Sequence, residues 1–171
     1  AYNDELTVYT WSTSADKLFA ERDFRITDKN GETIVIATSR WLYMDINRRR
    51  PVRITPEIMD RYESEPETHV FTEKVNRIDP PDTGYIEIPY NILRRDVDYL
   101  GHMHNISYLD AAYDVMPEEY FNGPQFNFVS IEYRKELLRN DEVKAHFYKI
   151  DKGCIISLNT DKINAVIMLK Y

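Results

Sequence analysis

Residues 96–109, DVDYLGHMHNISYL, mark the point where the chain changes from strand-like to helical patterning. The first part of this stretch carries two aspartates and two histidines and is typical of a polar loop. From residue 106 onward, apolar side chains recur at the spacing of one helix face: Ile106, Leu109, Tyr113 and Met116. Pro117 then limits the helix. The stretch therefore predicts a loop rich in ionisable groups that leads directly into an amphipathic helix.

Strand-like segments surround this helix on both sides in the sequence. One lies at residues 85–94, before the loop, and four follow the helix, at residues 126–137, 142–150, 154–159 and 165–171. Turn residues separate the last three strands. One strand, one central helix and a four-strand meander predict an α+β domain in which a curved antiparallel sheet wraps around a single helix. This is the element order of a hotdog domain.

The N-terminal part repeats the strand pattern without the helix. Three strands are expected, at residues 5–12, 18–27 and 32–45, and the turn at residues 28–31, Asp-Lys-Asn-Gly, favours a hairpin. We therefore expect a tandem hotdog protein whose first copy is incomplete at its N-terminus. The expected boundaries are residues 1–52 for the first domain, 53–84 for a linker and 85–171 for the second domain.

Composition narrows the function classes. The chain has 171 residues and a formal net charge of -7, which argues against general nucleic-acid binding. It has no apolar run long enough to span a bilayer and no signal-peptide pattern, so we expect a cytoplasmic protein. The single cysteine, Cys154, excludes an internal disulfide. Its isoleucine neighbours indicate a strand, and a buried inert thiol is expected there rather than a nucleophile.

Several motifs resemble those of one enzyme family. Residues 96–109 resemble the Asp-x-Asp-x-x-Gly-His-x-x-Asn-x-x-Tyr stretch of hotdog thioesterases. Further stretches are similar to the two domains of acyl-carrier-protein (acyl-ACP) thioesterases: Thr10-Trp11-Ser12, Arg22-Asp23-Phe24-Arg25-Ile26, Ser39-Arg40-Trp41, Asn47-Arg48-Arg49-Arg50-Pro51 and Ile131-Glu132-Tyr133-Arg134-Lys135-Glu136. The resemblance implies hydrolysis of fatty acyl-ACP to free fatty acid, without a cofactor, in fatty acid biosynthesis.

The same resemblance implies the catalytic residues. It places the family's aspartate on Asp98, its histidine on His102 and its glutamate on Glu136. Two positions depart from the plant enzymes, because Leu100 stands where they carry an asparagine and Leu137 where a cysteine follows the glutamate. Leucine cannot attack a thioester, so a cysteine nucleophile is excluded at that position.

Thioester hydrolysis needs an activated water or a carboxylate nucleophile, and donors for the developing oxyanion. We expect Glu136 to activate the water while Asp98 orients the substrate or His102, and the reverse assignment stays open. His102 can also protonate the leaving thiolate. Backbone amides at Gly101 and Met103, near the helix start, are the expected oxyanion donors.

Simpler roles compete at each position. Asp98 is a candidate helix cap, and Glu136 a candidate exposed strand residue paired with a base. For Asn105 an N-cap or a loop brace is favoured over chemistry, and His104 is given a supporting role. His102 and His104 with a nearby aspartate suggest zinc, but no third ligand lies at a standard spacing, so no metal is expected.

Four arginines near the end of the first domain form a basic cluster: Arg48, Arg49, Arg50 and Arg53. Acyl carrier protein is acidic, so this cluster is a candidate docking patch, with a solvated linker as the alternative. Two other functions remain open, an acyl-CoA thioesterase and a non-catalytic acyl-binding module. A homodimer is a further expectation.

Overall fold

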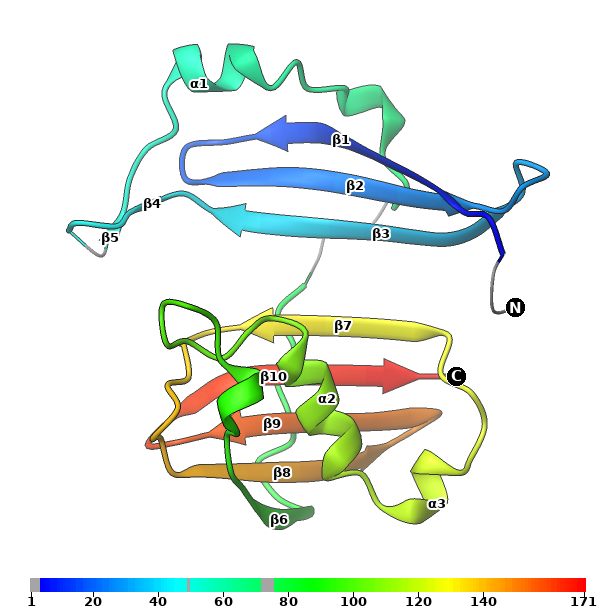
Figure 1. Cartoon of the computed structure of the whole chain (residues 1–171), viewed down its shortest axis with the longest axis vertical. Coiled ribbons are helices and arrows are strands. Elements are labelled where there is room, and N and C mark those ends of the chain that lie inside the picture. The colour runs from blue at the N-terminus through cyan, green and yellow to red at the C-terminus, as the bar shows by residue number, and fades with distance from the viewer. Residues whose placement is uncertain (1–3, 49, 72–75) are drawn as a thin grey trace. The chain divides into compact units, whose positions relative to one another are not determined.

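The computed structural model describes residues 4–48, 50–71 and 76–171 (Figure 1). The chain divides into two compact units, Ala1–Asn76 and Arg77–Tyr171. The division falls inside residues 53–84, the segment predicted to be a linker.

The first unit is built on a three-stranded antiparallel sheet. Its strands are β1 (Thr7–Ala15), β2 (Phe19–Thr27) and β3 (Thr33–Leu42), in the order β1-β2-β3. This is the predicted meander. The turn between β2 and β3 is closed by Asp28, whose carboxylate accepts hydrogen bonds from the amides of Asn30 and Glu32. The predicted third strand is shorter than expected, because a small hairpin of β4 (Met44–Asp45) and β5 (Arg50–Pro51) follows it.

The segment after β5 returns to the first sheet. It contains α1 (Pro56–Arg61) and the 3₁₀ turn η1 (Pro66–Thr68). The indole of Trp11 donates a hydrogen bond to the Thr68 carbonyl at 3.2 Å, and the amide of Val70 donates to the Asp23 carboxylate at 2.8 Å. These bonds make the segment part of the first unit, although it was predicted as linker.

The second unit carries a five-stranded antiparallel sheet and a helix. Its elements are β6 (Tyr85–Tyr90), η2 (Arg94–Asp96), α2 (Ser107–Asp114), α3 (Glu118–Phe121), β7 (Phe128–Tyr133), β8 (Val143–Ile150), β9 (Gly153–Asn159) and β10 (Ile163–Lys170). The strand order is β6-β8-β9-β10-β7. The α+β class is confirmed, but the four-strand meander is wrong, because β7 pairs with β10 and β8 pairs with β6.

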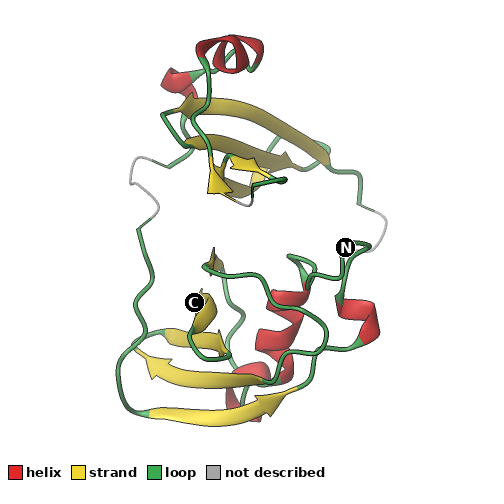
Figure 2. Ribbon diagram, turned by 90° about the vertical axis from the view of Figure 1, so that its left-hand side faces the viewer, coloured by secondary structure: helices red, strands yellow, loops and turns green. Residues whose placement is uncertain are grey.

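Helix α2 packs on one face of this sheet (Figure 2). Its buried residues include Tyr108, Ala111 and Ala112, and the small alanines let the helix lie close to the strands. The predicted apolar stripe is correct only in part, because Met116 is buried and Leu109 packs against the core. Ile106, at 57% exposed, and Tyr113, at 37%, do not join it. Strand side chains complete the core below the helix: Cys154, Ile156, Leu158, Ala165, Ile167 and Leu169.

The opposite face of the sheet has its own small core, formed by Ile78, Tyr148, Ile155 and Val166. Ile78 is held there through its backbone, because its amide donates to Glu132 and its carbonyl accepts from Arg134. No helix in the described part of the chain is long and apolar enough to cross a membrane.

Candidate active site

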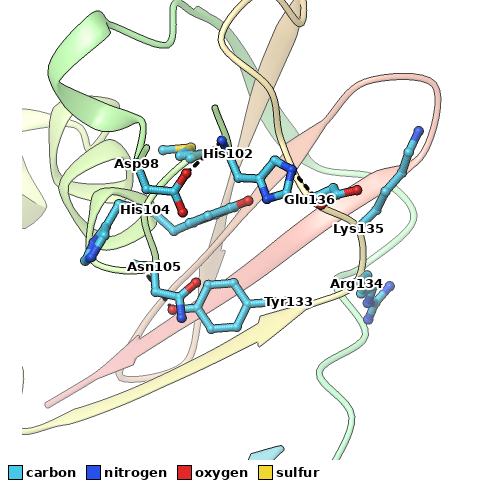
Figure 3. Close-up of a pocket in the computed structure, with 10 residues that line it drawn as sticks. Asp98, His102, His104, Asn105, Tyr133, Arg134, Lys135 and Glu136 are labelled. Carbon is cyan, nitrogen blue, oxygen red and sulfur yellow. Dashed lines mark hydrogen bonds and ion pairs between the residues drawn. The ribbon is translucent and has the colours of Figure 1, made fainter. Parts of the chain in front are cut away.

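A pocket of about 450 Å³ opens in the second unit (Figure 3). Three segments line it: the loop before α2, the first turn of α2, and the end of β7 with the segment that follows it. The lining residues are Asp98, His102, Met103, His104, Asn105, Tyr108, Tyr133, Arg134, Lys135 and Glu136. The pocket thus gathers the three residues expected to be catalytic.

Asp98 closes the loop before α2 on itself. Its Oδ1 accepts hydrogen bonds from the amides of Leu100, at 2.8 Å, and His102, at 3.1 Å. Its own amide donates to the His102 carbonyl at 2.8 Å. Gly101 completes the turn with a φ of +82°, which glycine adopts without steric cost. Asp98 therefore braces the loop and does not cap α2, and its half-buried carboxylate lines the pocket.

His102 and Glu136 face each other across the pocket. The Nε2 atom of His102 lies 3.2 Å from the Glu136 Oε2 atom, and the two side chains are 34% and 53% exposed. Figure 3 shows the imidazole pointing toward the carboxylate. Strand β7 ends at Tyr133, so Glu136 belongs to the irregular segment that follows and not to the strand predicted over residues 126–137.

Leu137 ties this segment to the loop and to the helix. Its carbonyl accepts a hydrogen bond from the Met103 amide at 2.8 Å, and its amide donates to the Tyr108 hydroxyl at 3.2 Å. Its side chain is fully buried in the core. The position where a nucleophilic cysteine was excluded is thus a packing position in this chain.

The two expected oxyanion donors are already engaged. The Gly101 amide donates to the Asp98 carbonyl at 3.1 Å, and the Met103 amide donates to the Leu137 carbonyl. Neither N–H is free to bind a substrate oxygen in this arrangement. The expectation for these two amides is therefore wrong.

His104 and Asn105 hold the turn into α2. The Nδ1 atom of His104 accepts a hydrogen bond from the Ile106 amide at 3.3 Å, and Figure 3 shows its ring turned away from His102. The Asn105 carbonyl accepts from the Tyr133 hydroxyl at 3.0 Å. Ile106 occupies the N-cap position, so the N-cap prediction for Asn105 is wrong, while Asn105 does brace the loop through its backbone.

Comparison of the sequence with known families gives two matches. The sequence profile of the acyl-ACP thioesterase N-terminal domain matches residues 1–62, and that of the C-terminal domain matches residues 81–169. The chain belongs to the acyl-ACP thioesterase family. The pocket lies within the part that matches the C-terminal domain.

Curated relatives agree with this membership. The chain is 27% identical over 154 residues to oleoyl-acyl carrier protein thioesterase 2, chloroplastic, from Arabidopsis thaliana, and the match covers 84% of the chain and 42% of that protein. A palmitoyl-acyl carrier protein thioesterase from the same plant is 25% identical over 150 residues, covering 84% of the chain and 36% of the relative. The chain thus spans about two fifths of the length of these relatives.

Solved structures share the fold. An acyl-ACP thioesterase from Bacteroides thetaiotaomicron superposes with a TM-score of 0.80 at 20% identity, covering 98% of the chain and 68% of that structure. The 12:0-ACP thioesterase from Umbellularia californica gives a TM-score of 0.80 at 17% identity, over 99% and 68% of the two chains. The hotdog architecture expected from the sequence is confirmed.

The expected site residues did not include two tyrosines that line this pocket, Tyr108 and Tyr133. The rings of Tyr108 and Tyr133 lie 5.1 Å apart, edge to face. Burial raises the pKa of both hydroxyls, which keeps them protonated and able to donate. Both could have been found in the quoted stretches, because Tyr108 ends the hotdog thioesterase pattern and Tyr133 lies in the stretch from Ile131 to Glu136.

The arginines proposed for docking lie in the first unit. The Nε atom of Arg48 is 3.8 Å from the Asp45 Oδ2 atom, while Arg50 and Arg53 are exposed. Arg49 lies outside the described residues. Among the described residues, no group of three His, Cys, Asp or Glu side chains is placed to hold a metal ion.

Proposed function

We propose that this chain carries the catalytic centre of an acyl-ACP thioesterase, which hydrolyses fatty acyl-ACP to free fatty acid and carrier protein. The observation that supports it is the pairing of His102 with Glu136 at 3.2 Å in a pocket that Asp98 also lines. Membership of the acyl-ACP thioesterase family supports the proposed substrate class. The chain covers only 42% of the first curated relative, so the activity of the whole protein is part of the proposal.

Glu136 acts as the general base in this proposal. Its carboxylate takes a proton from water, the water oxygen attacks the thioester carbonyl carbon, and the collapsing intermediate expels the thiolate of the carrier's prosthetic arm. The proton returns to that thiolate through Glu136 or His102. Asp98 has the orienting role, because Oδ1 already accepts two backbone hydrogen bonds that fix the loop bearing His102.

The developing oxyanion needs donors other than those expected from the sequence. The amides of Asn105 and Tyr108 donate no hydrogen bond within the described part of the chain, and both residues line the pocket. Tyr108 lies in the first turn of α2, where helix amides are left unpaired and partly positive, and Asn105 lies in the turn just before the N-cap residue Ile106. They are the proposed oxyanion donors, in place of Gly101 and Met103.

Carrier docking is assigned to the basic cluster of the first unit. Arg50 and Arg53 expose their guanidinium groups, and an acidic carrier would be steered by them despite the net charge of -7. The cytoplasmic location and the homodimer stay predictions. The named Arabidopsis relatives are chloroplastic proteins.

The test is a substrate panel. The protein is incubated with acyl-ACP and acyl-CoA of matched chain lengths, and free thiol release is followed. Faster release from acyl-ACP supports the proposal. Equal or faster release from acyl-CoA would make it an acyl-CoA thioesterase, and binding without release would make it an acyl-binding module.

The docking proposal has its own control. Replacing Arg50 and Arg53 by alanine should raise KM for acyl-ACP several-fold and leave turnover of acyl-CoA unchanged, with a salt dependence that weakens in the variant. An exposed arginine of the second unit, Arg139, serves as the matched substitution. Equal losses with both substrates would remove the carrier-docking role from the cluster.

A further inference from the structure

Asn164 lies behind the segment that carries Glu136. We propose that it is a positioning residue, which sets where the Glu136 carboxylate stands against His102. The inference rests on the catalytic role proposed for Glu136. Asn164 is fully buried in β10, at the point where the pairing of β10 with β9 shifts register between Ile163 and Ala165.

Asn164 binds three consecutive residues of the segment. Its carbonyl accepts hydrogen bonds from the amides of Arg134, at 2.8 Å, and Lys135, at 3.0 Å. Its side-chain Nδ2 donates to the Glu136 carbonyl at 3.3 Å. The last β7–β10 pair is Tyr133 with Ala165. Regular pairing therefore stops at Asn164, and the chain bends away from the sheet just before Glu136.

The orientation of the Asn164 carboxamide is fixed from its other side. Its Oδ1 accepts a hydrogen bond from the Thr160 amide at 2.9 Å, with the Thr160 hydroxyl also at 2.9 Å. A backbone N–H can only donate, so it selects the oxygen of the carboxamide. The nitrogen is thereby directed to Glu136.

Glu136 is thus held on both sides by backbone bonds. Asn164 holds the residues up to Glu136, and the next residue, Leu137, is bound by Met103 and Tyr108. The side chain of Glu136 itself is 53% exposed and has one polar contact, with His102, within the described residues. Its position consequently depends on the backbone, and a carboxylate displaced by about 1 Å loses on the order of a hundredfold in rate.

The sharpest variant is Asn164→Asp. It keeps the size of the side chain and the acceptor for Thr160, but it puts an oxygen against the Glu136 carbonyl where a donor stood. We expect kcat for acyl-ACP to fall about 10- to 100-fold, with KM changed less than about twofold. In a Glu136→Gln background the same substitution should cost almost nothing further, because the residue it positions has already lost its function.

Two further variants separate positioning from packing. Thr160→Val removes the hydroxyl contacts to Asn164 and Asp161 but keeps the amide bond that selects the carboxamide oxygen, so its loss in kcat should be much smaller than that of Asn164→Asp. Asn164→Ser avoids the buried charge of the aspartate, so it replaces Asn164→Asp if that variant does not fold. Combined with Glu136→Gln, it should lower kcat no further than Glu136→Gln does alone. Losses that multiply in the double variants would overturn the positioning role.

A crystal structure of the Asn164 variant gives a readout that needs no activity. We expect the pair between His102 and Glu136 to be broken while the bond from Met103 to Leu137 persists. An unchanged distance between His102 and Glu136 would overturn the inference. If the wild-type protein hydrolyses no thioester, the proposed function fails, yet this structural comparison still decides whether Asn164 places Glu136.

Discussion

The two units of the chain are both built from antiparallel strands, but they bury different kinds of side chain. In the second unit, α2 covers one face of the sheet, and the buried residues are mostly apolar, with five polar exceptions: Asp96, Ser107, Ser157, Asn159 and Asn164. In the described part of the first unit, the buried residues are four polar ones and a single apolar one: Ser12, Thr13, Asp23, Thr27 and Ile54. The apolar side chains of β3 stay exposed, with Ile34 at 52% and Val35 at 46%.

This difference explains which unit holds the pocket. Strands of similar composition form a rigid platform only where another element packs on them. In the second unit the packed helix fixes Tyr108, which binds Leu137 next to Glu136. The proposed catalytic pair needs to be held to within about 0.5 Å, and among the described residues the second unit has the denser apolar core to support it.

The largest expected effect comes from opening a cavity in the second unit. Ile156 is fully buried in β9, so Ile156→Ala should lower the free energy of unfolding of that unit by about 2–5 kcal/mol. Val35→Ala is the matched substitution in the first sheet, and it should cost less than about 1 kcal/mol because the side chain is 46% exposed.

Both tryptophans, Trp11 and Trp41, lie in the first unit. Tryptophan fluorescence therefore reports unfolding of the first unit, whereas circular dichroism also reports unfolding of the second. In denaturant titrations, Ile156→Ala should shift the circular dichroism transition of the second unit and leave the fluorescence transition in place. A fluorescence shift as large as the dichroism shift would show that the two units unfold together, and the comparison between them would fail.

The next effect concerns the Cys154 thiol, which lies in the core beneath α2 in the second unit. Burial raises the pKa of Cys154 to about 11, from an ordinary value of 9.0. At pH 8 the native protein should therefore react with a thiol reagent at least about a hundredfold more slowly than the denatured protein. The unfolded protein loses the Cys154 proton at a lower pH than the folded protein does. The free energy of unfolding is therefore unaffected by this thiol below pH 9.0 and falls as the pH rises from there through about 11. Rapid labelling at pH 8 would mean that the core opens.

A smaller effect is expected in the first unit. Asp23 is fully buried, and its Oδ2 accepts a hydrogen bond from the Val70 amide and lies 3.5 Å from the His69 Nδ1 atom. Asp23→Ala leaves that amide without its partner and should cost about 1–3 kcal/mol, measured by tryptophan fluorescence. The exposed Asp60 of α1 is the control, and Asp60→Ala should change little. Equal effects would mean that the segment over the first sheet contributes no specific stability.

Local patterns predicted the elements well, but not their arrangement. Strands and the helix follow from side-chain periodicity, which each segment carries by itself. The pairing of β7 with β10, and the face that α2 buries, depend on contacts between distant segments. Ile106 and Tyr113 were wrongly placed in the buried stripe for this reason, since the helix turns Tyr108 and its two alanines toward the sheet.

The site shows the same division. The motif located Asp98 and His102, and the resemblance added Glu136, because these are positions that a linear pattern records. The Met103 amide looked available from the sequence, yet Leu137 accepts its hydrogen bond from a remote segment. Asn164 was invisible for the same reason, since its role exists only when β10 lies beside the end of β7.

The central claim is that Glu136 in the second unit performs the hydrolysis. The most direct measurement is kcat/KM for acyl-ACP in Glu136→Gln, beside Glu142→Gln, an exposed glutamate outside the pocket. We predict a loss of about 10²- to 10⁴-fold for Glu136→Gln and wild-type activity for Glu142→Gln. Full activity in Glu136→Gln would contradict the account.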